Sequence, residues 1–72
     1  MQARDLVRMA NQIAEFFAAY PHDAAVKETI YHLEHFWDPR MRRELSTYVA
    51  RTEEGLDPIA LEAAKAMSAP AA

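Results

Sequence analysis

The sequence predicts an all-α fold, a small bundle of three to four short helices that forms a single domain over residues 1–72. Three observations indicate this fold class. Apolar residues recur every three or four positions along most of the chain, which is the period of an α-helix. Prolines interrupt that pattern at three places. The chain contains only one glycine, which leaves little room for tight hairpin turns between strands.

The first helix is expected over residues 2–20. Its apolar residues form one broad stripe at helical spacing: Leu6, Met9, Ala10, Ile13, Phe16, Phe17 and Tyr20. Polar residues such as Arg8 and Asn11 lie off this stripe. Pro21 ends the helix, because the residue before a proline avoids the helical conformation.

The second helix is expected over residues 23–36. The carboxylate of Asp23 can accept hydrogen bonds from the free N–H groups of its first turn. Its apolar stripe is narrow and consists of Val26, Ile30, Leu33 and Trp37. Because Trp37 ends this stripe at the corner where the next helix begins, we expect it to anchor the fold.

The third and fourth helices each follow an Asp-Pro pair. Asp38 and Asp57 suit the N-cap position, and Pro39 and Pro58 suit the first helical position, since a proline there gives up an N–H group that has no helical partner. The two helices are expected over residues 39–51 and 58–67.

A core of nine side chains is expected: Leu6, Ile13, Phe17, Val26, Ile30, Leu33, Trp37, Met41 and Leu45. A single core in so short a chain contributes only about 3–5 kcal/mol of stability. The chain has no cysteine, so no disulfide supplements it. Stability must therefore come from close packing or from a partner. The small residues 68–72 are expected to fray.

The apolar surface of the helices exceeds what a bundle of this size can cover. In the first helix the apolar residues span about half of the circumference, from Phe16 at one edge to Val7 and Ala14 at the other. Tyr31 lies away from the stripe of the second helix. Such surplus is typical of a protein that binds another protein, although single exposed apolar residues are also ordinary.

Charge and hydropathy argue against two classes of partner, nucleic acids and membranes. The formal net charge is −3, whereas a nucleic-acid binder usually carries a basic balance. No stretch approaches the roughly 18 apolar residues of a membrane span. The first residues carry no apolar run typical of a signal peptide, so we expect a cytoplasmic protein that contacts neither nucleic acid nor membrane.

One pair of histidines has a spacing that metal sites also use. His32 and His35 are three apart on one helix, and Glu28 lies one turn before His32. No third or fourth ligand is evident, so a solvated or interface face is the better interpretation. Ser46 and Thr47 have no neighbouring base, and we expect no catalytic, cofactor-binding or metal-binding residue.

One basic cluster stands out in this acidic chain. Arg40, Arg42 and Arg43 occupy the first turn of the third helix, where positive charge opposes the helix dipole. The cluster could bind an acidic patch on a partner, or form a solvated face with a local Arg40–Glu44 pair. The candidate partner-binding residues are Arg40, Arg42, Arg43, Phe16, Tyr31 and His35.

Several strings resemble the delta subunit of the soluble NAD-dependent formate dehydrogenases. The most specific are Asn-Gln-Ile-Ala at residues 11–14 and Phe-Trp-Asp-Pro-Arg-Met-Arg at residues 36–42. The resemblance extends over about residues 6–66. The loop at residues 52–54 is more acidic than the glycine-rich stretch expected of relatives.

The resemblance implies a non-catalytic accessory subunit of a cytoplasmic complex that oxidises formate and reduces NAD. It also implies that the complex carries molybdenum or tungsten on a bis-pterin guanine dinucleotide, iron–sulfur clusters and FMN, all outside this chain. The implied partner is the large catalytic subunit, and the implied role is assembly, stability or cofactor insertion.

Two alternatives remain on the sequence alone. The chain could be a free-standing helical module that self-associates. Less favoured is a DNA-associated module in which the second and third helices form a helix-turn-helix, with the three arginines on phosphates.

Overall fold

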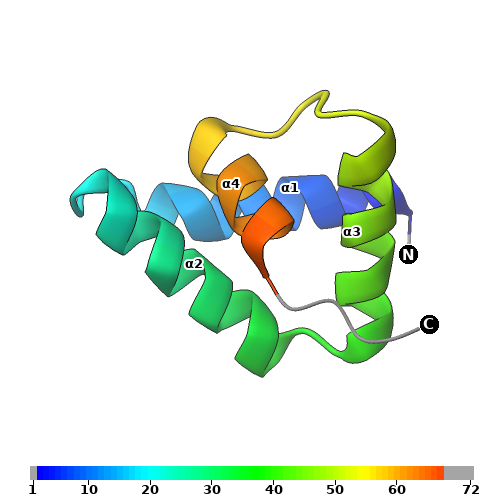
Figure 1. Cartoon of the computed structure of the whole chain (residues 1–72), viewed down its shortest axis with the longest axis horizontal. Coiled ribbons are helices and arrows are strands. Elements are labelled where there is room, and N and C mark those ends of the chain that lie inside the picture. Colours follow the sequence, from blue (N-terminus) through cyan, green and yellow to red (C-terminus); the bar gives the residue numbers. More distant parts are fainter. Residues whose placement is uncertain (1, 68–72) are drawn as a thin grey trace.

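The chain forms four α-helices, as described by a computed structural model over residues 2–67. They are α1 (Ala3–Phe17), α2 (His22–Phe36), α3 (Pro39–Arg51) and α4 (Pro58–Ala66) (Figure 1). Within residues 2–67 there is no strand, so the all-α prediction is confirmed. The expected tail, residues 68–72, lies outside the described part of the chain.

Local side-chain chemistry explains where α3 and α4 begin. The carboxylate of Asp38 accepts a hydrogen bond from the N–H of Met41 at 2.9 Å. Asp57 does the same for the N–H of Ala60 at 2.8 Å. Each bond satisfies one of the N–H groups that the first turn of a helix leaves free. Both Asp-Pro pairs therefore act as the sequence indicates.

The boundaries of the other two helices differ from the expected ones. Asp23 lies inside the first turn of α2, which begins at His22, and Pro21 occupies the cap position without a side-chain bond. The helix α1 ends at Phe17, because the N–H groups of Ala18 and Tyr20 bond to carbonyls only three residues back. Those tighter turns break the α-helical pattern before the proline is reached.

The helix α4 lies in the centre of the arrangement. It packs against α1, α2 and α3, with its most extensive contact to α2, and Figure 1 shows it in front of α1 and between the other two. The radius of gyration is 10.9 Å, close to the roughly 11 Å expected for a compact chain of this length. The four helices therefore form one packed unit.

Alanine dominates the surface that α4 buries. Its fully or almost fully buried residues within the helix are Ala60, Ala63 and Ala64. On the facing helix α2, Ala25 and Thr29 are buried too. The hydroxyl of Thr29 donates to the carbonyl of Ala25 at 2.8 Å, so burial leaves this group satisfied. Small side chains on both helices allow their backbones to approach closely.

The observed core differs in part from the nine residues expected. Five of these are buried: Leu6, Val26, Leu33, Trp37 and Leu45. Three more, Ile13, Ile30 and Met41, are half-buried and pack against the core. Phe17 is half-buried and lies outside the core cluster.

Two residues that we assigned to surplus apolar surface are in fact buried. Val7 is 7% exposed and Ala14 has no exposed surface. The reason is that α1 contacts all three other helices, so it buries a wider arc than a helix that packs on one side only.

Hydrogen bonds from Asn11 attach the loop between α3 and α4 to α1. The Asn11 amide donates to the carbonyl of Gly55 at 2.8 Å and accepts from the N–H of Asp57 at 3.1 Å. Gly55 has a φ of 84°, a conformation that disfavours any side chain. The same loop accepts a hydrogen bond from the hydroxyl of Tyr48 at the carbonyl of Glu54. Side chains of α1 and α3 therefore hold the loop that leads into α4.

We expect Asn11→Ala to lower the free energy of unfolding by about 1–2 kcal/mol, because two hydrogen bonds of ordinary strength are lost. The neighbouring variant Gln12→Ala is the matched control, since Gln12 is exposed and has no such bonds among the described residues. Urea unfolding of both variants measures the difference. Equal stabilities would show that the Asn11 hydrogen bonds contribute nothing to the fold.

Candidate functional site

A basic groove runs along the exposed side of α3, and we call it the α3 groove. Its volume is about 490 Å³. Ala3 at the start of α1 forms one wall. The remaining lining comes from α3: Arg40, Arg43, Glu44, Thr47, Tyr48 and Arg51. These α3 residues follow one another at intervals of three and one, which keeps them near one side of the helix.

The charge of α3 contrasts with that of the whole chain. The helix holds four arginines and one glutamate, a formal charge of +3, whereas the chain carries −3. Arg40 does pair with Glu44, its Nε lying 3.7 Å from the carboxylate. Such an exposed pair contributes only about 0.3–0.5 kcal/mol. Arg43 and Arg51 are exposed and form no ion pair within residues 2–67.

Arg42 occupies a different environment from the other two arginines of the cluster. It is half-buried and does not line the α3 groove. It thus belongs to the fold more than Arg40 and Arg43 do, and the three arginines do not form one surface. Sequence reasoning missed Arg51, although its spacing of eleven from Arg40, close to three helical turns, indicates that both lie on one side of the helix.

A second, apolar groove lies between α1 and α2, and we call it the α1–α2 groove. Its volume is about 420 Å³, and its lining is Met9, Gln12, Ile13, Phe16, Phe17, His32 and Trp37. Phe16 at its edge is 76% exposed and packs edge-to-face on Phe17. Phe36 is 70% exposed and lies against the ring of His32. Phe16 belongs to the surplus apolar surface expected from the sequence, and Phe36 adds a second exposed ring that was not assigned to it.

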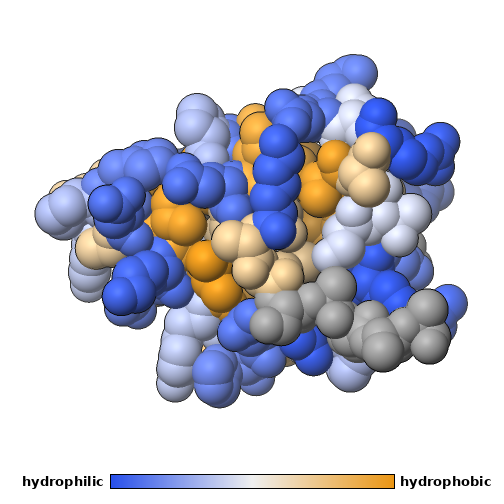
Figure 2. All heavy atoms as spheres, in the orientation of Figure 1, coloured by the Kyte–Doolittle hydropathy of each residue, from blue (hydrophilic) through white to orange (hydrophobic). Residues whose placement is uncertain are grey.

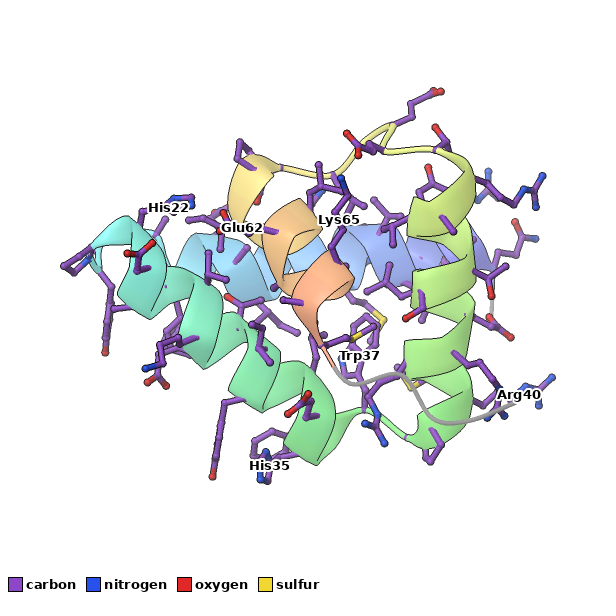
Figure 3. The ribbon with its side chains drawn as sticks, in the orientation of Figure 1. His22, His35, Trp37, Arg40, Glu62 and Lys65 are labelled. Atoms are coloured by element: carbon purple, nitrogen blue, oxygen red, sulfur yellow. The ribbon has the colours of Figure 1, made fainter. Side chains whose placement is uncertain are left out.

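Tyr31 and His35 form a third region on the exposed side of α2. Their rings stack with centroids 3.9 Å apart, and Nδ1 of His35 lies 2.9 Å from the carbonyl oxygen of Tyr31. Figure 3 shows His35 and Arg40 pointing away from one another. The structure therefore divides the six candidate residues among α3, the α1–α2 groove and the exposed side of α2.

The two closely spaced histidines do not converge on one point. The ring of His32 lies against Phe36, whereas that of His35 lies against Tyr31. Among residues 2–67 no group of three or more His, Cys, Asp or Glu side chains could hold a metal ion. The chain also has no cysteine to ligate an iron–sulfur cluster. The described residues therefore do not fit a metal or cluster site.

Two ion pairs attach α4 to its surroundings. Nε2 of His22, at the start of α2, lies 2.6 Å from the carboxylate of Glu62 (Figure 3). This hydrogen bond and the negative charge of Glu62 raise the pKa of His22 above its ordinary value. Lys65 pairs with Glu53 in the loop before α4. On the face shown in Figure 2, hydrophobic patches lie between hydrophilic residues.

Comparison with known families gives one match. The sequence model of the NADH-dependent formate dehydrogenase delta subunit family, FdsD, matches residues 5–64. The resemblance seen in the sequence is thereby confirmed. Every residue that lines the two grooves, apart from Ala3, falls within the matched span. No curated protein and no solved structure shows a significant match. Within residues 2–67, no helix has the length and apolar character needed to cross a membrane.

The His22–Glu62 pair predicts a dependence of stability on pH. The pKa of His22 is raised in the folded state relative to the value of about 6.5 in the unfolded chain. The pair therefore makes its full contribution to stability at pH values below about 6.5. That contribution is lost as the pH rises through the folded pKa. An NMR titration of His22 should show a raised midpoint that falls in Glu62→Gln and stays in the control Glu15→Gln. An unchanged midpoint in Glu62→Gln would contradict the assignment.

Proposed function

We propose, because the chain belongs to the NADH-dependent formate dehydrogenase delta subunit family, that it is a non-catalytic accessory subunit of such a complex. In this proposal it docks on the large catalytic subunit and aids assembly, stability or cofactor insertion. We also propose that the complex is cytoplasmic. The observation that carries the docking proposal is the α3 groove, a concentration of exposed arginines on one helix of an acidic chain.

Docking on a partner explains the arginines of the α3 groove better than a role in the fold does. Arg40 lies in the first turn of α3, where the helix dipole disfavours a positive charge. Arg43 gains no ion pair within the described residues. A guanidinium group recognises carboxylates through two parallel hydrogen bonds, and complementary charge speeds association. An acidic surface on the large subunit would supply the missing partners.

The redox groups belong to other subunits in this proposal. Molybdenum or tungsten on a bis-pterin guanine dinucleotide, the iron–sulfur clusters and FMN are assigned outside this chain. Cysteine thiolates are the usual ligands of iron–sulfur clusters, and this sequence has none to offer. The contribution of the chain is then a protein contact rather than a step of the reaction.

A second candidate is self-association of the free chain. The exposed rings of Phe16 and Phe36 beside the α1–α2 groove favour it, because large exposed apolar patches mark interaction sites. Sedimentation of the pure chain separates the two: a stable oligomer with no affinity for the large subunit supports the second candidate.

The docking proposal is tested by reversing charge in the α3 groove. We expect Arg40→Glu with Arg43→Glu to keep the helical circular dichroism spectrum. Recovery of the large subunit with a tagged chain should fall about tenfold, equivalent to about 1.4 kcal/mol. With the wild-type chain, recovery should also fall as salt rises, because screening weakens exposed charge pairs.

The matched control is Arg8→Glu with Lys27→Glu, which changes the net charge equally at residues outside both grooves. Recovery with this control should stay near the wild-type level. If the α3 double variant assembled with the yield and salt response of the wild type, α3 would be a solvated face. The α1–α2 groove would then be the better docking surface.

A further inference from the structure

We propose that the α3 groove binds an acidic segment of the partner, a short stretch of Asp and Glu side chains, and that Arg51 is its third anchor beside Arg40 and Arg43. All three arginines line the same groove. Arg51 lies eleven positions after Arg40, a distance of about 16 Å along the helix axis at 1.5 Å per residue. The identification of the large subunit as the source of this segment rests on the proposed function. The binding chemistry of the groove is independent of that function.

The arginines of the groove have capacity for new partners. Glu44 is the only acidic residue in the lining, and its contact with Arg40 is long, at 3.7 Å. The guanidinium groups of Arg43 and Arg51 have neither an ion pair nor a hydrogen bond within residues 2–67. Arg51 lies in the last turn of α3, where its charge suits the helix dipole, so the fold tolerates it without a partner. Each guanidinium can therefore receive a carboxylate.

The wall of the groove is already fixed before any partner binds. Tyr48 is half-buried and packs against the core. Its hydroxyl donates to the carbonyl of Glu54 at 2.7 Å. The loop that carries Glu54 is in turn attached to α1 through the Asn11 hydrogen bonds. A preformed groove reduces the ordering cost that binding would otherwise carry.

The arrangement favours spaced carboxylates over a dense polyanion. The three arginines are distributed along the helix and do not converge on one phosphate-sized point. Glu44 lies among them, and its negative charge would repel a phosphate backbone that carries a charge at every unit. A peptide can place uncharged residues opposite Glu44 and carboxylates opposite the arginines. We therefore expect the acidic segment in the groove to belong to a protein.

The test uses the isolated full chain and a fluorescein-labelled ten-residue peptide of alternating Glu and Ser. We expect binding at low salt, and no binding of the matching Gln–Ser peptide. Arg43→Gln and Arg51→Gln should each weaken binding about two- to fivefold, the range for exposed charge pairs. Arg51→Lys should weaken it less, because the charge remains. Lys27→Gln, outside the groove, should leave it unchanged.

Binding that is insensitive to Arg43 and Arg51, or absent at low salt, overturns the inference. So does tighter, arginine-dependent binding of tripolyphosphate or a short DNA oligonucleotide. The peptide assay contains no large subunit, so it can support the groove chemistry even if co-purification fails. Conversely, normal recovery of the large subunit with Arg51→Glu, together with no peptide binding, overturns this inference and leaves the proposed function standing.

Discussion

The structure depends on two hydrogen bonds from Asn11 in α1 to the loop that precedes α4. They connect residues that are 44 and 46 positions apart in the sequence. In one, the N–H of Asp57, the residue that caps α4, donates to the side-chain oxygen of Asn11. In the other, the amide of Asn11 donates to the carbonyl of Gly55, which has a left-handed conformation. The position of α4 follows from this attachment. Because α4 contacts every other helix, the arrangement of the bundle follows from the position of α4.

The same constraint leaves α3 open to a partner. The buried surface of α4 is made of alanines, so it packs closely against α2 but fills little volume. The helix α3 contributes only one fully buried side chain, Leu45. The side of α3 opposite Leu45 is available for other contacts, and Arg40, Arg43 and Arg51 are exposed there. We expect a subunit that gains stability from assembly to have a small core and an exposed basic surface of this kind.

The sequence predicts the parts of this structure that local chemistry decides. The Asp-Pro pairs place α3 and α4, since a cap and its N–H partner lie only three residues apart. The end of α1 was misjudged, because aromatic residues continue at helical spacing to Tyr20 although the backbone turns more tightly after Phe17. The sequence does not indicate which alanines of α4 are buried, because small residues give a weak periodic signal.

The candidate site was less predictable than the fold. Arg40 and Arg43 were found from their clustering in sequence, but Arg51 joins them only because the helix brings it to the same groove. The role of Asn11 could not be read from residues that lie more than forty positions away. Long-range contacts of this kind depend on how the helices pack, which no local pattern specifies.

The proposed docking surface of this chain is the basic side of α3. A cryo-EM structure of the chain in complex with the large catalytic subunit of a formate dehydrogenase would show whether that side forms the contact. We expect α3 to be buried against that subunit, with Arg40, Arg43 and Arg51 within hydrogen-bonding distance of its carboxylates. A structure in which α3 faces solvent, while the α1–α2 groove and Phe16 are buried in the contact, would contradict it.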